Sequence, residues 1–527
     1  MLSSILFVAD GLFDWRHILT NQRTKKVRKR RKVRQNSSPI GIVSTSDVRD
    51  IPAYELIRSD SVEEIDRISM GILEESGIEF RDEAAIATWR AAGAEVSGTR
   101  VKIPRELLRE KVSSAPAVYT QHARNPARTV EIGRTRMAFA PIYGSPFVRT
   151  LDGERRYARL VDFENFVKLT YLSPALNHSG GTVCEPADIP IAHRHLDMLY
   201  AHIRWSDKPF MGSVTSAERA EDCLSMCRVL FGESLRNSQT VMTSLTNCNS
   251  PLVWDGTMLS VIRVYASANQ ACIISPFIMQ GANTPVTTAG AFALLNAEAL
   301  AGIAYAQLVR PGAPVIYGAT LSTVSMQTGS PMYGTAEAQQ LTFLTGQMAR
   351  YYDLPMRVGG MRTGSKIADA QSAYESMQTM LPALIGGGNF FLHSAGWLES
   401  GLSACFAKFV MDTDQLVVLQ RLACGVDLSA DAFAVDAVHE VGPGGHFFGS
   451  DHTLQHFRDI FFSPETADQT TYEEWREGGS VDAYGRALRL AAAKLETYQA
   501  PPLEQAMEEA LREFIATRKA ELPGGVT

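Results

Sequence analysis

An alternation of short apolar runs with amphipathic stretches fills the middle of the 527-residue chain and limits the folds open to it. The runs are rich in β-branched and aromatic residues, as strands are, and each is followed by apolar residues at helical spacing. The eight runs are Met137–Tyr143, Leu176–Val183, Pro209–Val214, Thr240–Leu245, Ala271–Met279, Val315–Thr320, Met356–Gly360 and Phe390–Ala395. The eight stretches are Leu160–Leu172, Ile191–Trp205, Ala217–Leu230, Gly256–Ala268, Thr288–Val309, Thr335–Tyr352, Ile367–Leu384 and Leu402–Leu422. Alternating strands and helices form a parallel sheet, and eight units in a row predict an α/β fold with a closed (β/α)8 TIM barrel rather than an open doubly wound sheet.

Three further segments flank the predicted barrel, which we place at residues 136–424. Residues 51–135 predict an N-terminal α/β cap of helices and short strands. Residues 425–527 predict a C-terminal extension, in which a Gly/His-rich loop at Val441–His456 precedes two helices. Residues 1–50 are a basic extension that ends in a Ser/Pro-rich patch (Asn36–Pro39), and we expect them to be disordered.

The charge of the chain is unevenly distributed. The segment Arg23–Arg34 holds nine Lys and Arg and no acid, so removing it from a chain of net charge −6 leaves the remainder at −15. An acidic body is a poor partner for nucleic acid, because phosphate neutralisation needs a basic face. The basic segment itself could be a nucleic-acid arm or a targeting segment, but we favour a disordered tail from an upstream start codon.

The cysteines and the apolar runs indicate the cellular compartment in which we expect the protein. Seven scattered cysteines, an odd number, argue against a disulfide framework and for a reducing, cytoplasmic location. No uninterrupted apolar run reaches the roughly 18 residues of a membrane span. Met1–Ala9 is apolar but lacks a basic start and a clear cleavage site, so we expect neither a secretory signal nor a membrane partner.

Common cofactor and metal signatures are missing, and two near misses fail on spacing. Gly359–Lys366 has the glycine pair of a phosphate loop, but Ser365 precedes Lys366 instead of following it, so we predict a turn after the seventh strand. Asp436, His439 and Gly442 resemble the signature by which cobalamin domains supply an axial histidine, but Asp and His stand one residue too far apart. We therefore expect no tightly bound corrinoid in this chain.

Four histidines gather in the C-terminal extension. His452 and His456 stand four residues apart and could face one metal ion, while His439 and His446 precede them. The alternative is a loop-to-helix segment whose histidines bond the backbone. Because no cysteine or zinc-site spacing accompanies them, we favour that alternative and predict no metal site.

The carboxyl ends of the predicted strands supply the candidate site, since chemistry in barrels is placed there. These ends carry aromatic rings, hydroxyls and amides with few charges, which favours a small, cationic or zwitterionic, methyl-rich ligand. Aromatic faces attract a quaternary ammonium, and His393 could hydrogen-bond a carboxylate at the other end of the ligand. For any single ring, the alternative is that it fills the barrel interior. The candidate substrate-binding residues are Tyr143, Glu185, Asn247, Phe277, Gln280, Tyr333, Tyr374, Phe391, His393 and Trp397.

Several long stretches resemble one enzyme family. They are His122–Pro126 (HARNP), Phe139–Arg149 (FAPIYGSPFVR), Asp162–Leu169 (DFENFVKL), Asn177–Pro186 (NHSGGTVCEP), His202–Asp222 (HIRWSDKPFMGSVTSAERAED), Thr363–Glu375 (TGSKIADAQSAYE), His393–Gly401 (HSAGWLESG) and Gly442–Arg458 (GPGGHFFGSDHTLQHFR). On these motifs the chain resembles the trimethylamine:corrinoid methyltransferase family over roughly residues 55–520. The resemblance implies a (β/α)8 barrel that moves a methyl group from a methylated amine to the Co(I) corrinoid of a separate, cognate corrinoid protein.

One departure from the family pattern bears on the substrate. The trimethylamine-using members carry pyrrolysine in the active site, whereas this chain has ordinary residues throughout the matching segment Thr363–Ala395. It therefore resembles the non-pyrrolysine branch, which implies a quaternary amine such as glycine betaine. Because a quaternary nitrogen leaves as a neutral amine, no general acid or base is expected, and Glu185 and Glu399 are assigned positioning roles only.

Other readings stay open on the sequence alone. The same chemistry could use trimethylamine, proline betaine or carnitine, and a barrel that only binds betaines is the alternative of a different class. The sequence also leaves open whether the chain forms a homo-oligomer.

Overall fold

A computed structural model describes residues 47–232, 235 and 239–522. The expectations for the apolar start and the basic segment fall within residues 1–46 and lie outside the described residues. Of the described residues, 427–462 belong to one compact unit and the remainder to another. The central sheet and the helices around it all belong to the larger unit, which carries the candidate site.

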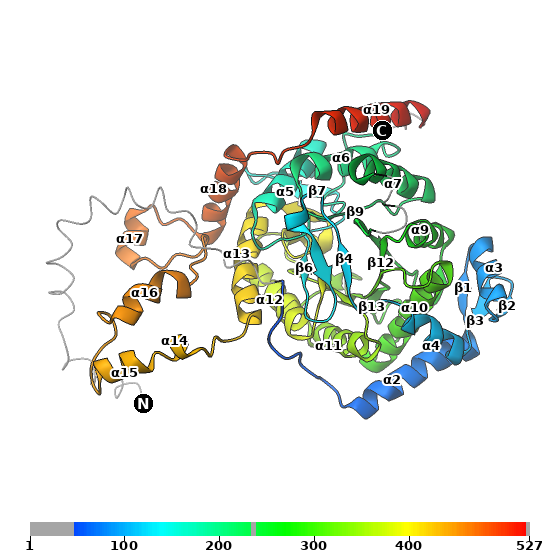
Figure 1. Cartoon of the computed structure of the whole chain (residues 1–527), viewed down its shortest axis with the longest axis horizontal. Coiled ribbons are helices and arrows are strands. Elements are labelled where there is room, and N and C mark those ends of the chain that lie inside the picture. The colour runs from blue at the N-terminus through cyan, green and yellow to red at the C-terminus, as the bar shows by residue number, and fades with distance from the viewer. Residues whose placement is uncertain (1–46, 233–234, 236–238, 523–527) are drawn as a thin grey trace. The chain divides into compact units, whose positions relative to one another are not determined.

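A curled sheet of seven parallel strands lies at the centre of the larger unit, inside a ring of helices (Figure 1). Its strand order is β6-β18-β17-β14-β12-β10-β9, so the sheet follows the chain order around the curl. Each strand falls in or next to one of the predicted apolar runs. The strands are β6 (Ala138–Phe139), β9 (Phe210–Met211), β10 (Met242–Thr246), β12 (Ala271–Ile274), β14 (Val315–Gly318), β17 (Met356–Gly359) and β18 (Phe390–Leu392).

The remaining predicted strand, Leu176–Val183, is extended chain without a regular ladder. Its backbone nevertheless bonds both edge strands of the sheet. The His178 N–H donates to the Phe139 carbonyl at 3.1 Å, and the Met211 N–H donates to the Gly180 carbonyl at 2.8 Å. The segment therefore lies between β6 and β9, where the eighth strand of the predicted barrel would stand.

The eight predicted helices are present, and their ends fall where capping side chains stand. Ser216, Asp255 and Asp369 each accept a hydrogen bond from a backbone N–H in the first turn of the helix that follows. The helices are α5 (Leu160–Leu172), α6 (Arg194–Trp205), α7 (Ala217–Phe231), α9 (Gly256–Ser267), α10 (Thr288–Val309), α11 (Ala336–Tyr351), α12 (Ala370–Ile385) and α13 (Phe406–Ala423).

Helix α10 is apolar on all sides. Among the described residues it is the one helix long and apolar enough to cross a membrane, but 89% of its most apolar window is buried inside the protein. A helix that is apolar all round and covered by protein is a core helix. Its composition is thus explained by its place in the larger unit.

Side chains on the parallel strands alternate between the inside of the curled sheet and the surrounding helices. Leu245, Ile273, Ile316 and Phe390 form one buried cluster inside the sheet. Their strand neighbours pack against the helices in a second, larger core. This alternation decides which residues at the strand ends point toward the candidate site.

A hairpin closes the amino-terminal end of the sheet interior. Its strands are β4 (Tyr119–Gln121) and β5 (Val130–Ile132), and Tyr119 packs into the cluster inside the sheet. The Gln121 side chain is fully buried, donates to the carbonyl of Val241 just before β10, and accepts from the Thr243 hydroxyl at 2.7 Å. Among the described residues, side chains of this hairpin therefore fill the interior at this end.

The residues before the central sheet form a small α/β layer. Its sheet has the order β11-β1-β3-β2, so one of its strands comes from the loop after β10. The π-helical turn after its first helix ends at Gly77, whose φ of 73° favours glycine. The elements are α2 (Ser59–Gly71), a π-helical turn (Ile72–Ser76), β1 (Ile78–Phe80), α3 (Glu83–Ala91), β2 (Glu95–Ser97), β3 (Arg100–Lys102), α4 (Arg105–Ser113) and β11 (Val253–Trp254).

Two further small sheets follow the carboxyl ends of the central strands. One continues the chain after β12 and β14, and the other continues it after β18 and β6. Their strands are β13 (Phe277–Gln280), β15 (Thr320–Val324), β16 (Pro331–Met332), β19 (Trp397–Leu398), β20 (Ser403–Cys405), β7 (Phe147–Arg149) and β8 (Arg155–Tyr157). Most of the candidate residues lie on or beside these sheets.

The C-terminal extension is mostly helical. In the larger unit it holds α17 (Tyr472–Glu477), α18 (Ala483–Glu496) and α19 (Gln505–Glu521). In the smaller unit it holds α14 (Ala430–Phe433), α15 (Val435–Val441) and α16 (Asp451–Ile460). Helix α16 occupies part of the predicted Gly/His-rich loop, because Ser450 caps a helix there that the glycines had obscured.

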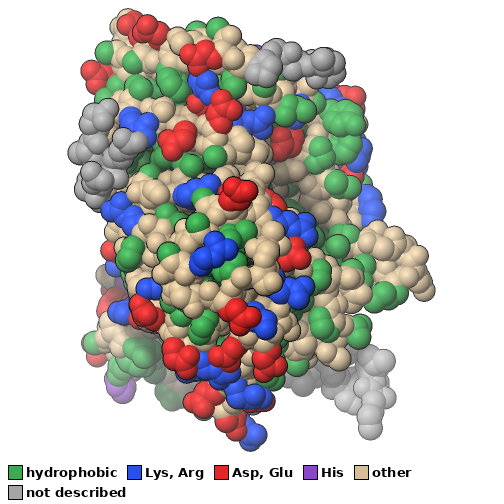
Figure 2. Space-filling model, turned by 90° about the vertical axis from the view of Figure 1, so that its right-hand side faces the viewer, with side chains coloured by type: hydrophobic (Ala, Val, Ile, Leu, Met, Phe, Trp, Pro, Cys, Tyr) green, Lys and Arg blue, Asp and Glu red, His purple; other side chains and the backbone are tan. Residues whose placement is uncertain are grey.

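The surface is of mixed charge where Figure 2 shows it. Positive and negative side chains are interspersed with apolar ones over that face. Many are paired locally, as in Arg67 with Glu64 at 2.6 Å and Arg81 with Glu79 at 2.8 Å. Exposed pairs of this kind contribute little to stability and mainly keep the surface hydrated.

Candidate functional site

A buried arginine occupies the inner face of the sheet at its carboxyl end. Met356 and Val358 of β17 pack into the helix-facing core, so Arg357 between them points into the interior of the curled sheet. Its guanidinium Nη1 donates to the Ala319 carbonyl at 2.8 Å and to the Thr320 hydroxyl at 2.5 Å. These partners follow β14, so the arginine ties neighbouring strand ends together.

His393 contacts the same guanidinium. It follows β18 with a φ of 66°, is 5% exposed, and places Nε2 3.2 Å from Arg357 Nη2. Because a guanidinium only donates, Nε2 accepts and the imidazole proton is carried by Nδ1. Burial and the charges of Arg357 and Arg362 hold the pKa of His393 well below its ordinary value, so the ring is neutral. Its Nδ1 is buried without a hydrogen-bond partner among the described residues.

A second buried arginine lies above the first. Gly359 is the next inner position of β17, and a Cβ there would collide with the Arg362 guanidinium. The Arg362 guanidinium carbon stands 5.1 Å from the centre of the Tyr333 ring. Its Nε and Nη1 are buried and unpartnered within the described residues. The missing side chain of Gly359 thus gives the space in which this guanidinium lies.

Burial shifts the ionisation of both arginines in the same direction. It lowers the pKa of Arg357 to about 9, with a further lowering from the charge of Arg362. It also lowers the pKa of Arg362, which the Tyr333 hydroxyl partly offsets. No carboxylate contributes to either shift, so the positive charge here is uncompensated.

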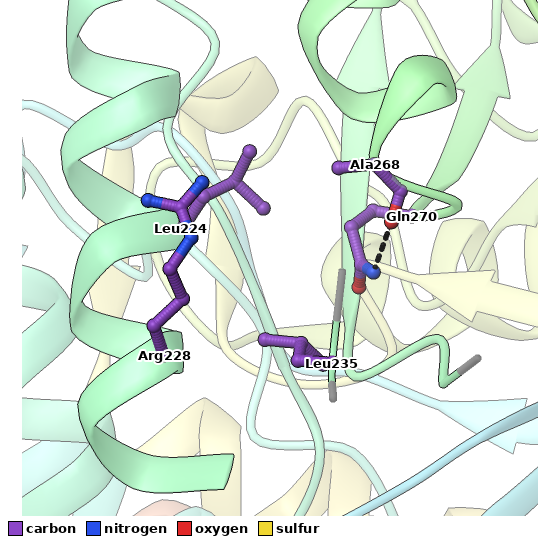
Figure 3. A pocket seen from close by; sticks show the side chains of 5 residues that line it. All are labelled: Leu224, Arg228, Leu235, Ala268 and Gln270. Carbon is purple, nitrogen blue, oxygen red and sulfur yellow. Dashed lines mark hydrogen bonds between the residues drawn. The ribbon is translucent and has the colours of Figure 1, made fainter. Parts of the chain in front are cut away.

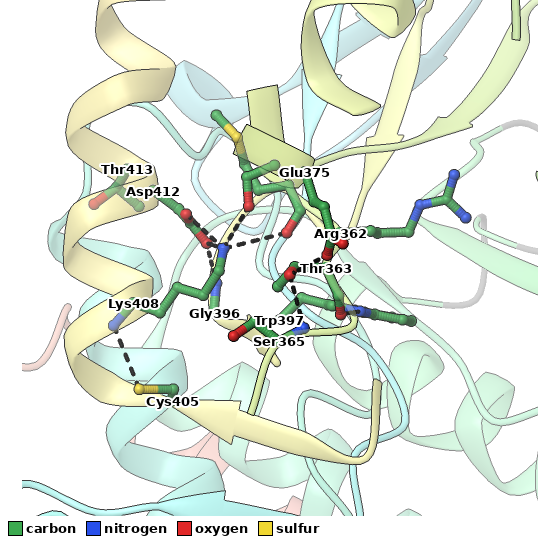
Figure 4. A network of polar contacts seen from close by, with 12 residues as sticks. Arg362, Thr363, Ser365, Glu375, Gly396, Trp397, Cys405, Lys408, Asp412 and Thr413 are labelled. Carbon is green, nitrogen blue, oxygen red and sulfur yellow. Dashed lines mark hydrogen bonds and ion pairs between the residues drawn. The ribbon is translucent and has the colours of Figure 1, made fainter. Parts of the chain in front are cut away.

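Trp397 stands beside these groups and is held by a polar network (Figure 4). Its ring centre lies 4.4 Å from that of His393 and 5.9 Å from that of Tyr333, both edge to face. Its Nε1–H donates to the Thr363 carbonyl at 3.1 Å, and the Thr363 hydroxyl donates to Glu375 at 2.6 Å. The indole is therefore fixed in position from its polar edge.

An ion pair supports the loop from behind. The Lys408 ammonium, 1% exposed, contacts both oxygens of Asp412 at 2.7 Å, and Asp412 accepts from the Gly396 N–H at 2.9 Å. Figure 4 shows the Arg362 side chain pointing away from this pair. Asp412 is thus committed to Lys408 and does not neutralise Arg362.

Four other candidates also follow the strand ends. Tyr143 is half-buried beside Gly181, and burial raises its pKa to about 12. Glu185 is half-buried near Arg194 at 3.8 Å, and burial raises its pKa. Asn247 Oδ1 and Gln280 Oε1 are buried oxygens without a hydrogen-bond partner among the described residues.

The remaining candidates stand apart. Phe277 on β13 is 38% exposed. Phe391 faces the helices, where it stacks on Phe139 with ring centres 4.5 Å apart. Tyr374 lies on α12 and is 68% exposed. The structure brings Tyr333, His393 and Trp397 together but does not bring Phe391 or Tyr374 to them.

The two arginines are absent from the candidates taken from the sequence. Arg357 had a signal, because it is the one charged residue in the apolar run Met356–Gly360. A charge inside a strand buried on both faces requires a partner or a ligand. Arg362 had no such signal in the sequence, because its position depends on how the loop folds back over Gly359.

The possible metal and phosphate motifs have ordinary partners. In the smaller unit, His456 Nε2 lies 3.2 Å from an Asp431 oxygen and His452 Nε2 lies 3.1 Å from the Asp431 carbonyl, so these three residues form a compact group. Gly359–Lys366 lies in the loop between β17 and α12, where Ser365 bonds Asp369, the cap of α12. That loop is the turn expected after the seventh strand.

A small pocket is lined by residues of α7, by Leu235 before β10 and by the residues just before β12 (Figure 3). It therefore lies at the amino ends of these strands, whereas the arginines lie toward the carboxyl ends. Catalytic sites of such sheets lie at the carboxyl ends of the strands. The pocket is therefore no candidate for the active site. Its lining residues are Leu224, Arg228, Leu235, Ala268 and Gln270.

Comparison with known proteins gives consistent matches along the chain. A family model described as trimethylamine methyltransferase (MTTB) matches residues 21–523. The glycine betaine methyltransferase of Desulfitobacterium hafniense (strain Y51) is 41% identical over 473 residues, which are 90% of this chain and 98% of that protein. The trimethylamine methyltransferase MttB of Desulfitobacterium hafniense (strain DSM 10664 / DCB-2) is 27% identical, over 85% of this chain and 90% of that protein. The proline betaine:corrinoid methyltransferase of Eubacterium limosum is 26% identical, over 87% of this chain and 96% of that protein.

Proposed function

This chain belongs to the trimethylamine methyltransferase family, and we propose that it takes a methyl group from glycine betaine and passes it to the Co(I) corrinoid of a separate protein. The observation that carries the proposal is the 41% identity to a glycine betaine methyltransferase, which extends over 98% of that protein. A match of this extent covers the barrel strands, the loops at their carboxyl ends and the C-terminal extension alike.

The chemistry of the site agrees with a quaternary donor. The bond between a methyl carbon and nitrogen breaks, its electron pair stays on nitrogen, and an electron pair of Co(I) forms the new carbon–cobalt bond. The product leaves as the N,N-dimethylglycine anion, whose nitrogen is an uncharged tertiary amine, so no proton has to move. His393 is neutral and bonded to Arg357, as expected for a site that does not use a general acid.

The chain's contribution is then to hold the donor with one methyl directed at the acceptor. Alignment and proximity can supply much of the barrier reduction in such a displacement. The rings of Tyr333 and Trp397 can offer their faces to the ammonium, and the unpartnered oxygens of Asn247 and Gln280 can offer negative charge density to its methyl groups. We assign Tyr143, Glu185 and Phe277 to the rim of the same opening, as positioning residues.

The corrinoid is assigned to a partner. The residues that resemble a cobalamin motif, Asp436 and His439, lie exposed on the short surface helix α15, and residues 427–462 around them form no parallel sheet. A surface helix does not enclose a corrinoid face. The acceptor protein therefore meets this chain at the carboxyl-terminal opening of the sheet.

We also infer that the central sheet is a closed (β/α)8 barrel, with residues 51–135 as its cap and 425–527 as its extension. The support is the bonding of His178 to one edge strand and of Met211 to Gly180 at the other edge. All seven cysteines are free thiols, which favours a cytoplasmic enzyme.

Methyl transfer in solution tests the proposal. Purified protein is mixed with Co(I) cobalamin or a cognate corrinoid protein, and methyl-cobalt absorbance is followed with glycine betaine, trimethylamine, proline betaine and carnitine. We expect methyl-cobalt with glycine betaine and at least tenfold less with the others. If methyl-cobalt forms only with another donor, that donor is the substrate instead of glycine betaine. If glycine betaine binds tightly but no methyl-cobalt forms with any donor, the chain is a binding protein.

A further inference from the structure

We propose that Arg357 and Arg362, together with the Nδ1–H of His393, bind the carboxylate of the donor and make the enzyme selective for carboxylated quaternary amines. This inference rests on the proposed function for the identity of the donor. It adds Arg357 and Arg362, which the sequence had not marked, to the carboxylate role that the sequence suggested for His393. It concerns the end of the ligand that does not react.

The first argument is the charge that burial leaves uncompensated. Arg357 is 0% exposed and Arg362 is 3% exposed, and neither forms an ion pair with a carboxylate among the described residues. Burying a guanidinium without a counter-charge costs several kcal/mol, and two adjacent ones also repel each other. A fold that keeps both in place is arranged for an anion that arrives from outside.

The second argument is the set of donors without acceptors. Arg357 Nε, Arg362 Nε and Nη1, and His393 Nδ1 are all buried and unpartnered within the described residues. Arg357 already bonds three oxygens through Nη1, so its orientation is fixed before a ligand binds. Fixed, unsatisfied N–H groups are what a carboxylate requires, since it has only acceptors.

The third argument is that the nearby acids are engaged elsewhere. Glu375 accepts from the Thr363 hydroxyl and the Gly364 N–H, and Glu399 pairs with Arg155 at 2.9 Å. Asp412 is held by Lys408. A shift of any of these side chains toward the arginines would break a bond that the structure already makes.

The arrangement also orients the donor. The ammonium of a betaine is repelled by the two guanidinium groups, so it points away from them once the carboxylate is bound. The arginines lie on the inner face near the strand ends, and the opening lies beyond them. The methyl groups are therefore directed outward, toward an acceptor protein at the opening.

Paired ligands and paired variants test the site. Binding of glycine betaine and of choline, which has the same ammonium but a hydroxyl in place of the carboxylate, is measured by calorimetry on the full chain. We expect Arg362→Met to weaken glycine betaine binding about 10- to 100-fold and to change choline binding less than about 3-fold. Arg362→Lys restores part of the loss, because it keeps the charge without the fork. Arg90→Met, exposed on α3, is the matched control and changes neither.

The outcomes separate this inference from the proposed function. Equal losses for the two ligands, or unchanged glycine betaine binding in Arg362→Met, would overturn the carboxylate site. Preferential binding of inorganic phosphate over acetate by the wild-type chain would also overturn it. Absence of methyl-cobalt with every donor would instead overturn the proposed function, while the binding measurements would still test the carboxylate site.

Arg357→Lys is tested second, because Arg357 links strand ends. Its unfolding temperature shows whether the variant folds normally.

Discussion

At the scale of single residues, the charge state of each group follows from what surrounds it. Arg357 and His393 share one hydrogen bond, and the direction of donation fixes the histidine tautomer. His393 therefore offers an N–H, never a second positive charge, to whatever binds above it. Burial and the charges of Arg357 and Arg362 both disfavour a protonated His393.

Trp397 gives a prediction about the donor's ammonium. Trp397→Ala should raise the KM for glycine betaine about 2- to 30-fold, since one cation–π contact contributes about 0.5–2 kcal/mol. Steady-state methyl transfer at varied donor concentration measures it. Trp397→Phe keeps a ring but loses the Nε1–H bond to Thr363, and should recover most of the KM. An unchanged KM in Trp397→Ala would remove the ring from the donor site.

Glu298 gives a prediction about pH and stability. This carboxyl on α10 is 0% exposed, accepts from the Ser250 hydroxyl and the Leu252 N–H at 2.6 Å, and burial raises its pKa to about 7. A carboxyl with a raised folded pKa stabilises the fold below its unfolded pKa, and this contribution is lost as pH rises through 7. Glu298→Gln should therefore gain up to about 3 kcal/mol relative to wild type between pH 5 and 8.

Denaturant unfolding at several pH values measures that difference. The comparison with wild type is needed because His178 and His202, with pKa values lowered to about 3 and 4, make stability rise with pH below about 6.5. Glu221→Gln, exposed on α7, is the control and should follow the wild-type curve. Parallel curves for Glu298→Gln and wild type would show that Glu298 ionises normally.

At the scale of elements, the end of β17 and the loop that leads from it to α12 hold the two arginines of the proposed carboxylate site. Gly359→Ala should displace the Arg362 guanidinium rather than unfold the protein, because the obstructing atoms belong to a flexible side chain. We expect glycine betaine binding to weaken at least about tenfold, with an unfolding temperature within about 3 °C of wild type. Gly364→Ala, where a Cβ would make only ordinary contacts, is the control. A stable Gly359→Ala protein with normal binding would show that this arginine is not needed at that position.

Helix α19 gives a prediction about how the C-terminal segment is attached. Arg518 contacts Asp222 at 2.6 Å, and also Glu218 and Glu521. Asp222 is buried and also bonds His195, so removing the arginine leaves a carboxylate with one partner fewer. Arg518→Ala should lower the free energy of unfolding by about 1–3 kcal/mol, measured with denaturant. Arg512→Ala, in an exposed pair with Glu508, should cost under about 1 kcal/mol, and equal costs would contradict a specific role for Arg518.

The helices were easier to predict from the sequence than the faces of the strands. Thr288–Val309 and Leu160–Leu172 match α10 and α5 to the residue, and Pro311 and Pro174 follow soon after their last residues. A parallel strand buried on both faces carries apolar residues at every position, so its pattern does not say which side chains point inward. Phe391 was chosen from such a run and faces the helices, whereas Arg357 faces inward. The position of Arg362 depends on a loop that no periodicity describes.

At the scale of the whole chain, sequence and structure agree on the type of protein more than on its geometry. The parallel order of the central strands was predictable from eight strand–helix units, since such units add strands in sequence. The irregular backbone of Leu176–Val183 was not predictable. There the His178 and Asn177 side chains accept hydrogen bonds from the backbone N–H groups of Gly180 and Phe139, in place of a regular ladder. That irregular segment also lies where the proposed barrel would close.

The hairpin of β4 and β5 has a consequence for the order of events in catalysis. Because it fills the amino-terminal end of the interior, the proposed function brings the small donor in at the carboxyl ends of the strands, which is also where we propose that the acceptor protein docks. Donor and acceptor then use the same entrance, so binding has to be ordered. The donor binds first, the acceptor protein docks second, and the demethylated product leaves last. An acceptor protein that arrives early bars the donor, so a large excess of the acceptor slows turnover instead of speeding it.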